Sequence, residues 1–333
     1  MLDMRRLNRS DRRTNQKRRH GYKLIDLIVT VAIIALLLSL ILPAMQNARV
    51  TGPRTECLNN LKNLGLAMHN YATVNAEQLP GHGTWSEDGD PRHSWIVPLL
   101  PYLDQAALAD RWDHKARWDS DTPGSESDIS NLELSQSALK VLKCPHRTNE
   151  DAALNYVVNA GFANYRNGKP HDFDQLGVDW NSDGTVNEAD HEIARDCGVL
   201  WRSVGERSGG WRLDDFYDGA GNTILLSERL QPGKQNWADP RPDNCAFVFA
   251  IDPSSKSVGS ARPDPLENVT INGYGSKSNQ RPMLSSNHHE QVNIITADGA
   301  ARGLSQDIDP KVLQQLITPR GTLHDEQPIS DQF

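Results

Sequence analysis

The most apolar stretch of the chain lies near its start. Between Leu27 and Leu42 sixteen consecutive residues carry no charge, and counted from Tyr22 the apolar segment reaches 21 residues. As an α-helix at 1.5 Å per residue, this length covers a hydrocarbon core of about 30 Å. The segment is apolar on every side, so it has no amphipathic face by which a core helix packs. We therefore expect a membrane-spanning helix over 22–43.

A second helical pattern follows, and it is amphipathic. Apolar residues recur every three or four positions between 58 and 72, with asparagine and lysine between them: Leu58, Leu61, Leu64, Met68 and Ala72. This spacing predicts a helix with one buried face, packed on a sheet. Gly52-Pro53 stands between the two helical patterns and should break or kink the chain there.

Strand-like runs come later in the sequence. They cover 155–159, 223–227, 246–251, 292–297 and 300–304. Asp298-Gly299 separates the last two, which is a strong hairpin signal. A short helix is expected from Pro310 to Ile317, a proline-rich loop or short helix over 94–103, and a long loop over 252–283. A helix first and antiparallel strands afterwards indicate the α+β class.

Charge divides the chain into a basic start and an acidic body. Residues 1–21 hold eight Lys/Arg and two acids, whereas the whole chain has a formal charge of −8. The acidic body argues against a nucleic-acid binder. The basic residues before the apolar segment predict a cytoplasmic N-terminus, with the body on the far side of the inner membrane, periplasmic or extracellular. The domains expected are a leader over 1–21, the helix over 22–43, and a head over 44–330 with an insertion at 169–196.

The residues around the start of the apolar segment form a processing motif. Gly21 precedes the aromatic Tyr22, an acid follows at Asp26, and Pro43 closes the apolar run. This layout resembles the prepilin-type leader of type IV pilins and type II secretion pseudopilins, which have Phe and Glu where this chain has Tyr22 and Asp26. The resemblance implies cleavage by a prepilin peptidase between Gly21 and Tyr22, with methylation. It also implies that Asp26 offsets the α-amino group of a sister subunit in a filament.

Further segments extend the resemblance over about residues 18–330. The chain is similar to a large bacterial pseudopilin-like family of unknown function through Cys57–Tyr71, Leu99–Gln105, Cys144-Pro145, Asp218–Leu225 with Glu228, and a C-terminal His-(nine residues)-Asp-Gly motif formed by His288, Asp298 and Gly299. The resemblance implies a pilin-like architecture, with a long N-terminal helix and a head that contains an antiparallel sheet. It implies no established activity.

An acidic loop between 179 and 190 has calcium-ligand spacing. Oxygen-bearing side chains recur at loop positions 1, 3, 5, 9 and 12, Gly184 stands at the sharp turn, and Thr185 offers its backbone carbonyl at position 7. The predicted ligands are Asp179, Asn181, Asp183, Thr185, Asn187 and Asp190. Such a set of oxygens suits Ca²⁺. The acid at the last position resembles the calcium loop of dockerin-type repeats, and an ordinary acidic turn is the alternative.

Four cysteines are compatible with two disulfides and three connectivities: Cys57, Cys144, Cys197 and Cys245. Since the first two lie in family segments, the resemblance favours Cys57–Cys144 and Cys197–Cys245, and buried free thiols are the alternative. The chain has no Cys-x-x-Cys spacing, which is the pattern typical of zinc sites and of thioredoxin chemistry.

No combination of residues indicates an enzyme. His288-His289-Glu290 is not a zinc-peptidase helix, and Ser285, His288 and Asp298 lack a nucleophile turn. His288 and Asp298 are expected instead to bracket a strand and satisfy backbone groups in the hairpin. His82 and His93 are interpreted as surface histidines.

The sequence therefore favours a membrane-anchored, pseudopilin-like envelope protein, a subunit or accessory of a type II secretion or type IV pilus-like assembly. Its expected partners are the membrane, sister subunits, the secretion machinery and the prepilin peptidase. A signal-anchored surface binding protein outside any filament and an exported hydrolase with a supporting calcium ion are the alternatives.

Overall fold

The fold is seen in a computed structural model that describes most of the chain. It covers residues 24–124, 127–145, 154–164, 179, 183–205, 209–229, 236–251, 271, 284–286, 288, 290–324 and 326–329, without the side chains of 40–51, 163–164 and 249–251. The chain divides into two compact units, Met1–Thr51 and Gly52–Phe333. The long loop expected over 252–283 lies outside the described residues apart from Ile271.

One long helix begins the described chain. Helix α1 runs over Leu24–Val74 and includes Asp26 in its first turn. The helix continues through Gly52-Pro53, so the predicted break is wrong, and the kink given as its alternative stays a prediction. A proline inside a helix removes one backbone hydrogen bond, and the remaining ladder on either side can hold the helical path.

The described helices contradict the prediction of a membrane-spanning helix. Within the described part of the chain, no helix combines the length and the apolar character that crossing a membrane requires. The transmembrane helix predicted over 22–43 is wrong on this finding, and so is the single-pass inner-membrane location that depended on it.

The second unit is α+β, with two sheets. The larger sheet has the strand order β6-β3-β5-β7-β8 and the smaller one β2-β1-β4. The strands are β1 Gly83–Trp85, β2 Pro91–Ser94, β3 Tyr156–Asn164, β4 Arg202–Val204, β5 Ile224–Glu228, β6 Ala246–Ile251, β7 Gln291–Thr296 and β8 Ala301–Ser305. The further helices are α2 Ile96–Leu99, α3 Ala106–Ala109, α4 Asn131–Leu134, α5 Glu188–Asp196, α6 Pro242–Cys245 and α7 Pro310–Ile317.

Both sheets are mixed, which corrects the expectation of an antiparallel sheet. Strand β3 pairs with β6 in parallel and with β5 antiparallel, and β1 pairs with β4 in parallel. The predicted hairpin is confirmed: β7 and β8 pair antiparallel around Asp298-Gly299, and Gly299 has a φ of +84°. The helix predicted after Asp309 is confirmed as α7, capped by the Asp309 side chain.

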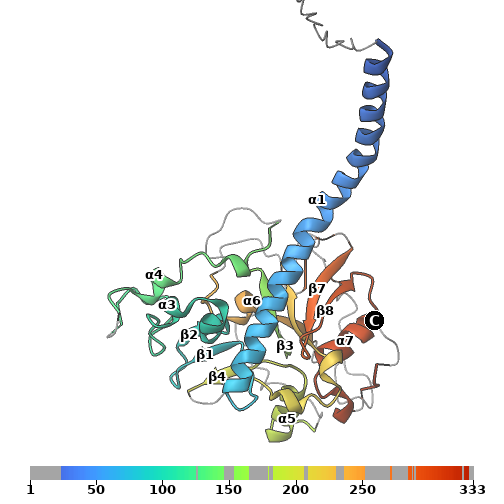
Figure 1. Ribbon diagram of the computed structural model, residues 1–333. Coiled ribbons are helices and arrows are strands. Elements are labelled where there is room, and N and C mark those ends of the chain that lie inside the picture. Colours follow the sequence, from blue (N-terminus) through green and yellow to red (C-terminus); the bar gives the residue numbers. More distant parts are fainter. Residues whose placement is uncertain are drawn as a thin grey trace, which may run out of the picture. The chain divides into compact units, whose positions relative to one another are not determined.

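The five-stranded sheet has a hydrophobic core on each face. Successive residues of β3 illustrate this, because Val158 belongs to the core that contains Leu61 and Leu64 of α1, whereas Val157 belongs to the core that contains Leu316 of α7. Figure 1 shows the second-unit part of α1 lying across the strands, with α7 beside β8. The amphipathic pattern predicted for 58–72 is therefore confirmed as the face of α1 that covers the sheet.

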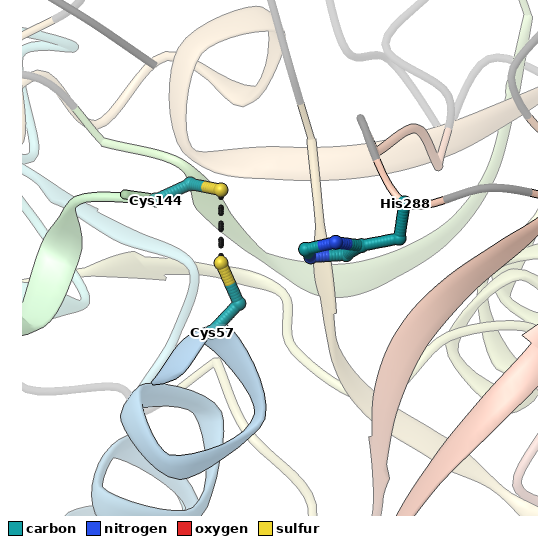
Figure 2. Close-up of side chains that lie close together, drawn as sticks. All are labelled: Cys57, Cys144 and His288. Atoms are coloured by element: carbon teal, nitrogen blue, oxygen red, sulfur yellow. Dashed lines mark hydrogen bonds between the residues drawn. The ribbon is translucent and has the colours of Figure 1, made fainter. Parts of the chain in front are cut away.

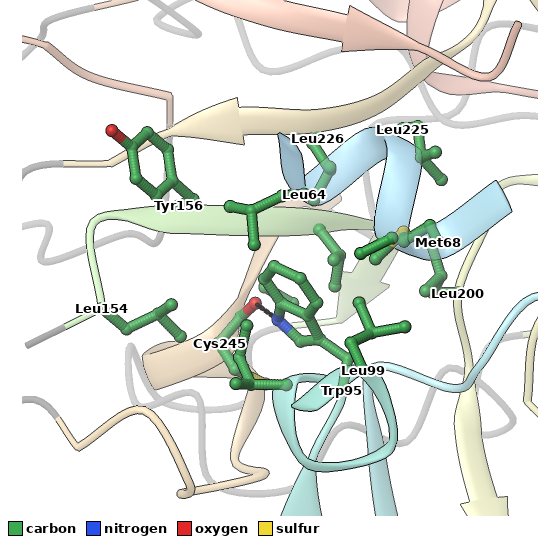
Figure 3. Close-up of a cluster of buried hydrophobic side chains, with 14 of the residues drawn as sticks. Leu64, Met68, Trp95, Leu99, Leu154, Tyr156, Leu200, Leu225, Leu226 and Cys245 are labelled. Carbon is green, nitrogen blue, oxygen red and sulfur yellow. Dashed lines mark hydrogen bonds between the residues drawn. The ribbon is translucent and has the colours of Figure 1, made fainter. Parts of the chain in front are cut away.

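Trp95 lies in the hydrophobic core between α1 and the five-stranded sheet. Trp95 is 1% exposed, and its indole N–H donates to the Cys245 carbonyl over 3.0 Å. Figure 3 shows this bond among Leu64 and Met68 of α1. The segment 94–103 contains α2 and a 3-10 helix, Leu100–Leu103, as its sequence predicts. Its buried leucines join the same core.

Candidate functional site

Four side chains from distant parts of the sequence meet beside the first turns of α1 in the second unit. Cys57 comes from α1, Cys144 from the segment before β3, Glu228 from the end of β5, and His288 from the segment before β7. All four are buried, at 5% exposure or less. We call these four residues the Cys–His cluster. Each lies in or at the edge of a segment that carries the family resemblance.

The two thiols are the closest pair in the cluster. The Cys57 and Cys144 sulfurs are 2.8 Å apart, although the residues are separated by 87 positions along the chain. Figure 2 shows the two side chains facing each other, with the His288 ring directed toward them. The two sulfurs and one ring nitrogen of His288 all lie within 4.8 Å of one another.

His288 is held by a buried carboxylate. Its Nε2 atom lies 3.2 Å from Oε1 of Glu228. Glu228 also accepts hydrogen bonds from the Asn293 backbone N–H at 3.0 Å and from the Asn293 side-chain amide at 2.9 Å. A buried carboxylate needs several such donors to offset its lost hydration. The network therefore fixes both the position of the Glu228 carboxylate and the orientation of the imidazole ring.

The same contacts determine protonation. Burial opposes the charged form of His288, but interactions with Cys144 and Glu228 outweigh it and raise the pKa of His288 to about 9. The hydrogen bond with Cys144, together with burial, raises the pKa of the Cys57 thiol. At neutral pH the reduced cluster therefore contains an imidazolium at His288 and a protonated Cys57 thiol.

Hydrogen bonds of two asparagine side chains hold the segments that carry the cysteines in place. The Cys144 backbone N–H donates to the Asn155 side-chain oxygen at 2.9 Å. Asn60, one turn along α1 from Cys57, donates to the Lys143 carbonyl at 3.1 Å and to the Tyr156 hydroxyl at 3.2 Å. The segment that carries Cys144 is thus hydrogen-bonded to the helix that carries Cys57.

The C-terminal motif divides into two parts. His288 belongs to the Cys–His cluster, whereas Asp298 closes the β7–β8 turn by accepting from the Thr296 hydroxyl at 2.5 Å and the Ala300 N–H at 3.0 Å. Burial opposes ionisation of Asp298, but these hydrogen bonds prevail and lower its pKa. The two residues bracket β7, and only Asp298 satisfies the hairpin backbone as expected.

The predicted calcium loop is described in part. Asp179 accepts from the Gly184 N–H at 3.0 Å, and Asp183 accepts from the Thr185 N–H at 2.8 Å and the Asn187 amide at 3.0 Å. Gly184 has a φ of +89°. Buried Asp190 closes a capping box with Asn187 at the start of α5. Asn181 lies outside the described residues.

The remaining predicted residues have mixed outcomes. Gly21 and Tyr22 lie outside the described residues. Cys197 lies in the core that contains α7, whereas Cys245 lies in the core beneath α1. The structure does not bring this second pair of cysteines together, and their pairing stays a prediction.

His82 and His93, expected at the surface, are buried. His82 contacts Trp85 edge-on, and burial is the main cause that lowers the pKa of His82 to about 4 and that of His93 to about 3. Both rings are therefore neutral packing groups of the small sheet.

One of three comparisons with known proteins identifies a family for this chain. Residues 46–311 match the model of a family described as a protein of unknown function, DUF1559. The chain belongs to this family. The match contains all four residues of the Cys–His cluster and the hairpin at Asp298-Gly299. No curated protein matches the chain, and no solved structure matches it either.

Proposed function

We propose that this DUF1559 protein is a pseudopilin-like subunit or accessory of a type II secretion or type IV pilus-like assembly, and that it joins sister copies through the first part of α1. The support is the surface of that helix. Its large apolar side chains are exposed on all sides, from 50% at Val29 to 77% at Leu24. Extended apolar surface of this kind marks an interaction site.

Apart from Asp26 in the first turn, the polar side chains of the segment 24–39 do not interrupt its apolar surface. The Thr30 hydroxyl donates to the Leu27 carbonyl at 2.8 Å, and the Ser39 hydroxyl donates to the Leu36 carbonyl at 2.7 Å. Hydroxyls that bond back to their own helix leave no polar group that must face water. Equivalent helices of sister copies offer a matching apolar surface, and contact between the two surfaces removes both from water.

Processing is the first test of this proposal. In the native host, the intact mass of the protein should correspond to a chain that starts at Tyr22. The substitution Gly21→Val should block cleavage, so the variant protein should still begin at Met1. Gly52→Ala is the matched glycine control, because no atom lies within 4 Å of the added carbon, and it should be processed normally. Wild-type protein that retains Met1 would contradict the proposal.

We also propose that the loop 179–190 binds Ca²⁺ and thereby fixes the start of α5. The support is that Asp179 and Asp183 both turn toward the backbone around Gly184. The neighbouring Asp190 is anchored by the capping box. Three carboxylates with this spacing form a hard-oxygen set, which is the type that Ca²⁺ prefers.

Calorimetry checks the calcium prediction. Titration of the full chain should give one site with a Kd of about 10⁻⁴–10⁻³ M, the range of extracellular modules. A hundredfold excess of Ca²⁺ over Kd should stabilise the fold by about 2.7 kcal/mol. Asp179→Ala should abolish both effects, whereas exposed Asp214→Ala should leave them intact. Equal heats for wild type and Asp179→Ala would remove the site.

A further inference from the structure

The closest contact of the Cys–His cluster is one that two free thiols do not ordinarily make. The Cys57 and Cys144 sulfurs are 2.8 Å apart, well inside the separation of two unbonded sulfur atoms and less than about 1 Å longer than a disulfide bond. Cys57 is 0% exposed and Cys144 is 3% exposed. The side chains face each other directly (Figure 2), so bonding requires only a small side-chain rotation.

We propose that Cys57 and Cys144 are joined by a disulfide in the mature protein, and that the His288–Glu228 pair sets how readily this bond is reduced. The disulfide connects α1 of the second unit to the segment that enters β3. The disulfide lies within the second unit. The proposal therefore does not depend on whether the first part of α1 assembles with sister copies.

Formation of the bond requires a disulfide oxidant, for example an oxidised dithiol protein. One cysteine thiolate attacks a sulfur of the oxidant disulfide, and a mixed disulfide forms while one oxidant thiolate leaves. The second cysteine thiolate then attacks the mixed disulfide and releases the other oxidant thiolate. Two electrons pass to the oxidant, and the two protons lost by the cysteines end on its two thiols. Because both cysteines are buried, this exchange precedes complete packing of α1 on the sheet.

His288 provides the tuning because of its charge and its position. One of its ring nitrogens lies within 4.8 Å of both sulfurs, and its Nε2 atom lies 3.2 Å from Oε1 of Glu228. The imidazolium interacts with the Cys144 side chain. A cation there favours the Cys144 thiolate and therefore the reduced state, which makes the disulfide easier to reduce. His288 acts on the thiol–disulfide equilibrium through its charge and forms no covalent bond to either sulfur.

The same three ligands could instead hold a soft metal ion. Two sulfurs and an imidazole nitrogen are typical ligands of zinc. However, two thiolates on a tetrahedral zinc ion, each at about 2.3 Å from the metal, lie about 3.7 Å apart. The 2.8 Å separation between the sulfurs favours the disulfide, and metal binding becomes an outcome of the test.

The first experiment maps the cysteines of the full-length protein, purified without reductant and alkylated during denaturation. Digestion and mass spectrometry should yield a linked Cys57–Cys144 peptide, which disappears after reduction. In Cys57→Ser, Cys144 should become alkylated. The proposal is wrong if Cys57 and Cys144 of the wild-type protein are both recovered in alkylated form. It is also wrong if the protein binds one equivalent of zinc while the two cysteines are unlinked.

The second experiment measures redox equilibrium in glutathione buffers of varied ratio. His288→Gln should shift the equilibrium about tenfold toward the disulfide, equivalent to about 30 mV. Glu228→Gln preserves the side-chain shape and should shift it in the same direction, because it lowers the charge on the ring. His191→Gln, a partly exposed histidine of α5, is the matched control and should have no effect. If wild type and both cluster variants share one midpoint while remaining folded, the tuning by His288 is refuted.

Discussion

Replacing Cys57 by serine is expected to lower the free energy of unfolding by about 4 kcal/mol in the absence of reductant. The disulfide that it removes would close a loop between residues 87 positions apart. A cross-link of this length strongly restricts the unfolded chain, and loss of that restriction accounts for most of the effect. Denaturant unfolding, followed by far-UV circular dichroism, measures the change.

Unfolding measured with and without a thiol reductant distinguishes the stabilisation by the cross-link from that by packing. With a thiol reductant, wild type and Cys57→Ser should differ only by the cost of placing a hydroxyl in a buried site, about 1–3 kcal/mol. Cys197→Ser, in the other core, is the matched control and should lose the same amount with or without reductant. If the loss in Cys57→Ser is equally large with and without reductant, the stabilisation comes from packing and not from a covalent bond.

The stability of the reduced protein is expected to fall by about 2 kcal/mol between pH 6.5 and pH 8.5. The pKa of His288 is raised to about 9 in the folded protein, whereas an unfolded histidine titrates near 6.5. The folded state therefore binds the proton more tightly. The resulting stabilisation is fully present below pH 6.5 and is lost as the pH rises through the folded pKa.

The source of this slope can be isolated by substitution. His288→Gln removes the titrating ring and should flatten the stability curve in this range, although the variant is less stable throughout because Glu228 loses its cationic partner. His191→Gln should keep the wild-type slope. Urea unfolding at a series of pH values gives both curves. A wild-type slope retained in His288→Gln would mean that another group binds the proton.

The larger sheet was predictable because its strands carry strong local signals. Apolar runs predicted β3, β5, β6, β7 and β8 to within a few residues, except that β3 extends to Asn164, and Asp298-Gly299 fixed the hairpin through a glycine at positive φ. The small sheet was missed because β1 and β4 have three residues each. Such short strands depend on tertiary pairing and not on a recognisable pattern.

The site was predictable as separate residues but not as a cluster. Cys57, Cys144, Glu228 and His288 each stood in a segment with family resemblance, yet their meeting depends on β3 and β5 pairing Tyr156 with Glu228. No local pattern encodes a contact between residues that far apart in sequence. Asn293 had no signal beyond being a polar residue within an apolar strand, and a buried polar residue of that kind does mark a hydrogen-bond network.

We propose that sister copies assemble through the first part of α1, with the Asp26 carboxylate against the α-amino group of Tyr22 of a neighbour. Zero-length carbodiimide coupling tests it directly, because it joins a carboxylate to an amine only when they touch. In a mixture of isotopically light and heavy full-length protein from the native host, a linked peptide between Asp26 of one copy and Tyr22 of another should form. It should disappear in Asp26→Asn and persist in exposed Asp88→Asn. Absence of any light–heavy linked peptide from wild type would contradict assembly through this part of α1.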